Sequence, residues 1–329
     1  MKAKVKEMLS HKDKTVPVLS FPSAQLLGIT VKELIGSAKM QAKGMEAIAK
    51  RCPIGAALNM MDLSVEAEAF GAKIRIYEDE IPAVEGGIID DICDAKDIVV
   101  PPVGAGRTAL YIDGIRMAKE RINHIPVFCG VIGPYSLAGR LFDMGELMLE
   151  CYDSPDEVKI LLEKCTQFIT AYIKAYKEAG ADGVVMAEPA AGLLSPALAE
   201  EFSTCYVQKI IDEVNDPDFV FCYHNCGAAA SDMMASFANL DADIFHLGNA
   251  VDIEKACRSL PKDKVVMGNV DPVLFRTGTP EIVAEDTQRV FDLCGKYENF
   301  MISTGCDVPA ASKWENIDTY FSKVTELYV

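Results

Sequence analysis

The chain has 329 residues, half of them hydrophobic, and its 49 acidic against 32 basic side chains give a net charge of −17. This length suits a single α/β barrel, and the acidic surface argues against nucleic acid or an anionic membrane as partner, because phosphate groups would be repelled. Residues 1–18 hold no apolar run of signal-peptide length, and no stretch approaches the ~20 apolar residues that span a bilayer.

The eleven cysteines indicate a reducing compartment, and we expect a cytoplasmic protein. Because eleven is odd, a monomer with every cysteine in a disulfide is excluded. Most of these thiols are expected to pack in the core as small hydrophobic side chains. Examples are Cys52, Cys93, Cys129, Cys165 and Cys205.

Short apolar runs of strand type alternate with helical patterns along the chain. The expected strands are Val16–Phe21, Ala56–Met61, Pro126–Ile132, Gly183–Ala187, Phe219–His224, Asp243–Leu247, Lys264–Gly268 and Asn299–Ser303. The expected helices between the later strands are Pro155–Ala179, Pro196–Val214, Ala229–Leu240, Ile253–Leu260 and Pro280–Cys294. Three of these helices begin with a capping residue followed by proline, as at Ser154-Pro155.

Strands that are apolar throughout and alternate with helices predict a parallel sheet covered on both faces. The eight units favour one (β/α)₈ barrel over residues 1–329, with an N-terminal extension. The stretch Gly71–Gly86 is expected to form an inserted hairpin rather than a separate domain. An open, doubly wound sheet is the alternative, but the glycine-rich phosphate loop after its first strand is missing.

Polar and metal-binding residue types follow the late strands at their carboxyl ends, where an α/β barrel has its active site. This coincidence is the main argument for an enzyme and against a barrel that only binds. The candidates are, in chain order, Glu188, His224, Cys226, His246, Asn249, Asn269, Asp271 and Cys306.

Three of these candidates, His224, Cys226 and Cys306, form a possible zinc site. His224 and Cys226 are two residues apart at a strand end, so both can point towards the barrel axis, and Cys306 follows the last strand. Three protein ligands leave the fourth position for a substrate, whereas a structural zinc site normally has four ligands. Cys222 competes for this role, but it lies deeper in the strand and is expected to pack in the core.

The remaining candidates each have a functional and a structural interpretation. Glu188 is either a solvated acid at the rim or a group that faces a cation or a proton. His246 either contacts a ligand or makes structural hydrogen bonds. Asn249, Asn269 and Asp271 either orient a bound molecule or cap the helices that follow.

Short segments spread over almost the whole chain carry a family resemblance. They are Thr15-Val16-Pro17-Val18, Gly133–Gly139, Ala179–Asp182, Glu188-Pro189 with Leu194-Ser195-Pro196, Gly268-Asn269-Val270 and Thr304–Asp307. With them the chain resembles the uroporphyrinogen decarboxylase superfamily, in its branch of corrinoid-dependent methyltransferases. The zinc motif of that branch, His-x-Cys followed far downstream by Cys, matches His224, Cys226 and Cys306. The acid after an earlier strand matches Glu188, where many relatives have Asp-Pro.

The chain departs from true porphyrinogen decarboxylases near its N-terminus. Those enzymes open with an Arg-Gln-Ala-Gly-Arg segment that holds substrate carboxylates, and the matching stretch Phe21–Gly28 contains no arginine. A polycarboxylated tetrapyrrole would therefore lack counter-charges in an already acidic protein.

The resemblance implies a zinc-dependent enzyme that moves a methyl group between a methylcorrinoid and a small thiol such as coenzyme M. The methylcorrinoid would be carried by a separate small corrinoid protein, since the chain has no corrinoid-binding Asp-x-His-x-x-Gly motif. Glu188 would fill the fourth zinc position at rest or accept the thiol proton. Two alternatives stay open, namely a corrinoid-loading methyltransferase acting on an O-, N- or S-methyl substrate, and a metal-free enzyme of the decarboxylase type.

Overall fold

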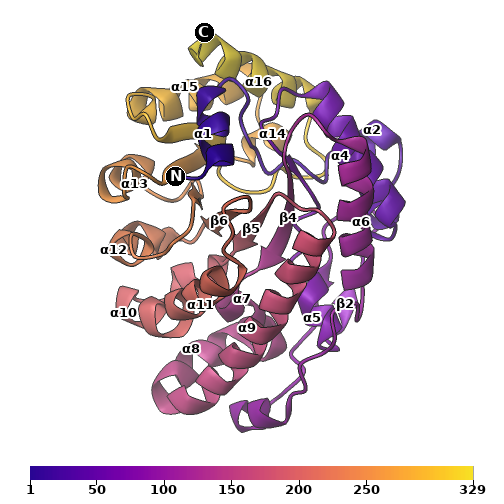
Figure 1. The fold of residues 1–329 in the computed structure, drawn as a ribbon, viewed down its shortest axis with the longest axis vertical. Helices are drawn as coiled ribbons and strands as arrows, with labels where there is room; N and C mark the ends of the chain where they lie inside the picture. The colour runs from indigo at the N-terminus through magenta and orange to yellow at the C-terminus, as the bar shows by residue number, and fades with distance from the viewer. Residues whose placement is uncertain (329) are drawn as a thin grey trace.

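A computed structural model describes residues 1–328 of the protein. Its centre is a curled sheet of seven strands in the order β1-β4-β5-β6-β7-β8-β9, surrounded by helices (Figure 1). The strands are β1 Ala57–Leu58, β4 Val127–Ile132, β5 Gly183–Ala187, β6 Val220–Asn225, β7 Ile244–Leu247, β8 Val265–Val270 and β9 Phe300–Thr304. All neighbouring strands are parallel, so their carboxyl ends lie together at one end of the sheet.

The helices cover the outside of this sheet. The longer ones are α1 Ala3–Ser10, α4 Ala38–Arg51, α6 Thr108–Arg121, α7 Pro134–Leu141, α8 Met144–Asp153, α9 Pro155–Glu178, α11 Cys205–Val214, α15 Pro280–Cys294 and α16 Trp314–Tyr328. The shorter ones are α2 Ser23–Leu27, α3 Val31–Ile35, α5 Val65–Ala69, α10 Pro196–Ala199, α12 Met234–Phe237, α13 Ile253–Ser259 and α14 Leu274–Thr277. None of the helices among residues 1–328 is long and apolar enough to cross a bilayer.

The sheet corrects the prediction of eight strands, because the expected strand Val16–Phe21 does not form. This segment is buried near β9 and contacts it through side chains. The Val18 N–H donates to Thr304 Oγ1 at 3.1 Å, and Ser303 Oγ donates to a backbone carbonyl of the segment at 2.8 Å. Pro17 has no N–H to give to a ladder, which is one physical reason why no eighth strand pairs here.

Helix α1 covers the amino end of the sheet. Its buried side chains Val5 and Met8 belong to the same apolar cluster as the residues that fill the inside of the sheet. Those interior residues include Leu58, Phe128, Val185, Val220, Cys222, Ile244, Val265, Met267 and Met301. Lys4 of α1 pairs with Asp182, just before β5, at 2.8 Å. The N-terminal extension thus closes the end opposite the carboxyl ends of the strands.

The inserted hairpin is confirmed, since β2 Ile74–Arg75 and β3 Ala83–Val84 pair antiparallel. Two helix predictions need correction. The expected helix Pro196–Val214 is interrupted by a π-helical turn at Glu200–Thr204, and Ala229–Leu240 breaks into a 3₁₀ turn, Ala228–Asp232, and the short α12.

The cysteines only partly follow the prediction. All eleven are free, and Cys52, Cys129 and Cys165 are buried as expected. Cys93 and Cys205 are exposed, so the prediction is wrong for these two. The acids Asp91 and Asp94 on either side of Cys93 are a sequence signal for its exposure.

Candidate metal centre

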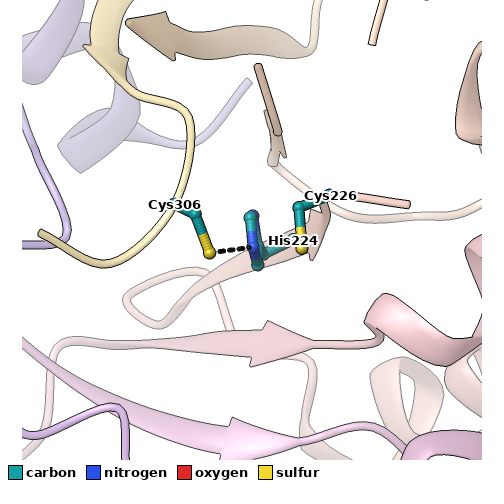
Figure 2. Close-up of side chains that lie close together, drawn as sticks. All are labelled: His224, Cys226 and Cys306. Atoms are coloured by element: carbon teal, nitrogen blue, oxygen red, sulfur yellow. Dashed lines mark hydrogen bonds between the residues drawn. The ribbon is translucent and has the colours of Figure 1, made fainter. Parts of the chain in front are cut away.

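Three side chains with metal-binding atoms meet at the carboxyl end of the sheet (Figure 2). His224 lies near the end of β6, Cys226 directly follows that strand, and Cys306 follows β9. Their ligand atoms all lie within 4.8 Å of one another, and Cys306 Sγ is 3.6 Å from His224 Nε2. His224 is buried and both cysteines are half-buried, so the group sits just inside the mouth of the sheet.

Glycines let the loops around this group approach closely. A Cβ atom at Gly248, after β7, would lie 2.5 Å from the Cβ of Cys226. A Cβ atom at Gly192 would lie 2.5 Å from the Cα of Gly227, where the loops after β5 and β6 touch. Real Cβ atoms essentially never come so close, so any side chain at these glycines would push the loop that carries Cys226 out of place.

The separations fit a tetrahedral zinc ion. With Zn–S bonds of about 2.3 Å and Zn–N bonds of about 2.0–2.1 Å, a nitrogen and a sulfur ligand lie about 3.5 Å apart. The 3.6 Å between His224 Nε2 and Cys306 Sγ matches that value. Cys222 is buried and does not belong to the group. His224, Cys226 and Cys306 could therefore hold a zinc ion and leave one position open.

The two thiols of the group differ in acidity. A hydrogen bond from Cys226, together with the neighbouring His224, lowers the pKa of Cys306 well below its usual range. The same hydrogen bond and burial raise the pKa of Cys226. Cys306 is therefore the more acidic thiol of the pair. A bound cation would favour the thiolate form of both cysteines.

His246, in β7, is the residue paired with His224 of β6 in the sheet. The two Nδ1 atoms are 2.8 Å apart, and His246 Nε2 is 2.6 Å from the carbonyl oxygen of Thr304. Burial, and after it the neighbouring His224, lower the pKa of His246 to about 3, so this ring is neutral at physiological pH. His246 is thus next to the metal centre, but it is outside the group of three ligands.

Glu188 is completely buried rather than solvated. Its carboxylate accepts the N–H groups of Tyr135 at 2.9 Å and Ser136 at 2.7 Å, at the N-terminus of α7. Burial outweighs these hydrogen bonds and raises the pKa of Glu188 to about 7. The approach requires Gly133, because a Cβ atom there would lie 2.4 Å from a Glu188 oxygen. Glu188 does not belong to the group of three ligands, and its roles as a ligand or proton acceptor stay predictions.

The three other predicted residues lie on the loops after β7 and β8. Asn249 is exposed. Asn269 is buried, and its Nδ2 donates to two carbonyls of the loop after β7, at 3.0 and 2.9 Å, while no described group bonds to its Oδ1. Asp271 accepts the N–H of Val273 at 2.9 Å, just before α14. Asn269 and Asp271 therefore make hydrogen bonds within the loops at the mouth, but neither caps a helix, since α13 is capped by Asp252 and α14 has no side-chain cap. A role in orienting a bound molecule stays a prediction.

Sequence reasoning did not single out Asp307, although it directly follows Cys306. Both of its carboxylate oxygens are buried without a partner among the described residues. Burial, and after it the charge of Cys306, raise the pKa of Asp307 well above its usual range. An acid next to the third ligand was a signal in the sequence that could have found it.

A buried charged cluster after β1 was also missed. Arg107 donates to Asp62 at 2.5 Å and to Glu68 at 2.6 Å, and Tyr111 donates to the same Asp62 carboxylate at 2.8 Å. The loop after β1 and the start of α6 lie far apart in the sequence, so no local spacing indicates the cluster. The positive charge of Arg107 is offset by two carboxylates.

Comparison with known proteins places the chain in a family. The family model for uroporphyrinogen decarboxylase (URO-D) matches residues 17–327. The chain belongs to this family. A methylcobamide:CoM methyltransferase, MtbA of Methanosarcina acetivorans, is 27% identical over 262 residues, covering 78% of this chain and 75% of the relative. A uroporphyrinogen decarboxylase of Coxiella burnetii is also 27% identical, over 286 residues that cover 82% of this chain and 76% of the relative.

Solved structures show the same fold. A methyltransferase from Methanosarcina mazei aligns with a TM-score of 0.88 at 21% sequence identity. The alignment covers 100% of the present chain and 99% of the methyltransferase chain. A B12-independent methionine synthase from Shewanella aligns with a TM-score of 0.62 at 14% identity, over 88% of each chain. The resemblance to the uroporphyrinogen decarboxylase superfamily is thereby confirmed. Its methyltransferase branch is supported by the similarity to methylcobamide:CoM methyltransferases.

Proposed function

We propose that this member of the URO-D family is a zinc-dependent methyltransferase that moves a methyl group between a methylcorrinoid and a small thiol. The observation that carries the proposal is the group of His224, Cys226 and Cys306, whose separations suit zinc with one open position. The similarity to a methylcobamide:CoM methyltransferase supports a corrinoid as methyl carrier and coenzyme M as the first thiol to test.

The chemistry requires a thiolate at neutral pH. A free alkyl thiol has a pKa of about 8.5 and is mostly protonated at pH 7. Zinc held by His224, Cys226 and Cys306 would supply a Lewis acid that lowers the pKa of the incoming thiol. The two protein thiolates would offset the charge of the ion, so that the substrate sulfur would keep the electron density that it needs as a nucleophile.

In the transfer, the substrate sulfur forms a bond to the methyl carbon while the carbon–cobalt bond breaks, and that electron pair stays on cobalt. The thiol proton must leave before this step. Glu188, with its pKa raised to about 7, is suited to accept a proton at neutral pH. Because both of its oxygens already accept backbone N–H groups, a further proton has to use the remaining lone pairs.

A separate small corrinoid protein is the proposed partner, docking at the mouth of the sheet above the metal centre. The reverse reaction, in which zinc activates a methylated compound and the corrinoid is loaded, uses the same residues and is the second candidate. The decarboxylase alternative has less support. The segment Phe21–Gly28 offers no arginine, and Arg107 is already paired with Asp62 and Glu68.

The test is methyl transfer from free methylcobalamin to coenzyme M and other small thiols without oxygen, followed as the loss of the methyl–cobalt absorption. We expect turnover that disappears when a chelator removes zinc and returns when zinc is added. His224→Ala should abolish it, whereas His124→Ala, an exposed histidine outside the site, should not. Folded, zinc-containing protein that leaves methylcobalamin untouched with every thiol would contradict the proposal. The next assay would then offer methylated substrates with reduced corrinoid protein.

A further inference from the structure

A chain of hydrogen bonds crosses the inside of the sheet from β9 to β6 and ends at the metal centre. It begins at the carbonyl of Thr304, passes through the ring of His246 in β7 and reaches Nδ1 of His224. The contacts are short, 2.6 Å at His246 Nε2 and 2.8 Å between the two Nδ1 atoms. The other nitrogen of His224, Nε2, faces Cys306 (Figure 2).

The partners fix where each proton lies. His224 Nδ1 is 3.1 Å from the carbonyl oxygen of His246, which can only accept, so this nitrogen carries a hydrogen. His246 Nε2 faces the carbonyl of Thr304 and, at 3.2 Å, the hydroxyl of Ser303. That hydroxyl already donates its hydrogen to the carbonyl of Val16, so it too accepts from His246. His246 is therefore protonated at Nε2, and its Nδ1, at 2.8 Å, is free to accept the hydrogen of His224, which His224 shares between this nitrogen and the carbonyl oxygen of His246.

We propose that His246 is a positioning residue that holds His224 in the Nδ1–H tautomer and so directs the lone pair of Nε2 to the metal. The inference rests on the proposed zinc site and goes beyond it, since His246 itself provides no ligand. The hydrogen bonds also connect two of the ligands, because Thr304 is the last residue of β9 and Cys306 follows two residues later. One neutral ring thus sets the tautomer of His224 and the separation between His224 and Cys306.

A histidine in this position has an electrostatic consequence. Ligating histidines usually donate their second N–H to a carboxylate, a carbonyl or water, and removing such a partner weakens metal binding roughly 10–100-fold. A carboxylate here would add a negative charge to a centre that already has two thiolates. His246 accepts the same hydrogen bond without adding charge, which keeps the zinc centre close to neutral.

The first experiment compares two substitutions of similar shape. In His246→Asn the side-chain oxygen can replace Nδ1 as acceptor, whereas His246→Leu fills similar space without an acceptor. Zinc affinity is measured by competition with a chromophoric chelator, and thermal unfolding verifies that both proteins are folded. We expect His246→Leu to lose roughly 10–100-fold in zinc affinity and His246→Asn to retain most of it. Equal losses in the two variants, or no loss in either, would overturn the proposal.

The second experiment needs no substitution. The chain has four histidines, and the two outside the site, His11 and His124, are exposed. Nitrogen-15 labelling of histidine in the zinc-loaded protein reports by NMR which nitrogen of each ring carries a hydrogen. We expect one ring protonated at Nδ1, His224, and one at Nε2, His246. His246 protonated at Nδ1 alone would refute its role as acceptor without removing the zinc site, whereas wild-type protein that binds no zinc would refute the proposed function and with it this role.

Discussion

Each cysteine of the metal centre is expected to be essential for zinc and dispensable for folding. The molecule has a large buried core that does not depend on these side chains, unlike a small zinc finger. Cys226→Ser and Cys306→Ser should therefore lose most of the zinc, measured by elemental analysis, and keep the circular dichroism spectrum of the parent. Cys205→Ser, which removes an exposed thiol outside the group, is the matched control. Full zinc retention in both site variants would remove the basis of the proposed function.

Glu188 should make the stability of the protein depend on pH. Burial raises its pKa to about 7, whereas an unfolded glutamate has a pKa of about 4.3. The folded state thus binds the proton more tightly, so this group makes the free energy of unfolding fall as pH rises from about 4.3 to about 7. Urea unfolding of wild type and Glu188→Gln across this range should show a flatter curve for the variant.

Two controls separate this effect from others. Glu120→Gln, at an exposed position of α6, should leave the curve unchanged. Zinc content should stay the same in Glu188→Gln if the carboxylate accepts hydrogen bonds from the N-terminus of α7 and does not bind the metal. An unaltered curve with lost zinc would instead identify Glu188 as a ligand.

The candidate site could be predicted in part because of where its residues lie in the sequence. His224, Cys226 and Cys306 carry metal-binding atoms at strand ends, and parallel strands bring those ends together. The same reasoning expected Glu188 to face solvent, a cation or a mobile proton, but its carboxylate is buried against the N-terminus of α7. The hydrogen-bond partner of a buried polar group depends on how the loops fold over the strand ends. The hydrophobic periodicity of the sequence gives no information about that folding.

Helix α1 is held against the sheet by an ion pair between Lys4 and Asp182. Hydrogen bonds from Lys119 and Lys4 outweigh burial and keep the pKa of Asp182 below its usual range. A lowered pKa contributes stability above the unfolded value of about 3.9, and this contribution disappears as pH falls through the folded value. Asp182→Asn should therefore cost on the order of 1 kcal/mol at pH 7 and little at an acidic pH below the pKa that Asp182 has in the folded protein.

Chemical denaturation at both pH values gives this difference directly. Asp263→Asn, at an exposed position outside the ion pairs, is the control. The same loss of stability at both pH values would mean that the Asp182 side chain acts through packing rather than charge.

The elements that the sequence predicts well are those with a strong local pattern. Strands β4 to β9 fall within two residues of their predicted bounds, since strands buried on both faces are continuously apolar. The segment Val16–Phe21 has the same apolar pattern but forms no strand. Its hydrogen bonds with β9 involve side chains, and Pro17 has no backbone N–H to donate to a neighbouring strand. The π-helical turn at Glu200–Thr204 keeps the helical direction, so hydrophobic spacing does not reveal it.

The molecule as a whole should reject uroporphyrinogen. Its net charge of −17 repels a polyanionic tetrapyrrole, and Phe21–Gly28 has no arginine to bind the carboxylates. Incubation with uroporphyrinogen, analysed by chromatography of the oxidised porphyrins, should yield no coproporphyrinogen. A uroporphyrinogen decarboxylase of the same family is the positive control. Turnover comparable to that control would restore the decarboxylase alternative.

The closure of the amino end by α1 bears on the order in which substrates arrive. Since Val5 and Met8 fill that end, we expect a molecule that reaches His224 and the two cysteines to enter and leave by the opposite mouth. Under the proposed function a small thiol and a much larger corrinoid protein share this one entrance, and the larger molecule covers it. The thiol must then bind first, and the methylated product can leave only after the corrinoid protein has dissociated. Steady-state kinetics would accordingly follow a compulsory order rather than a random one.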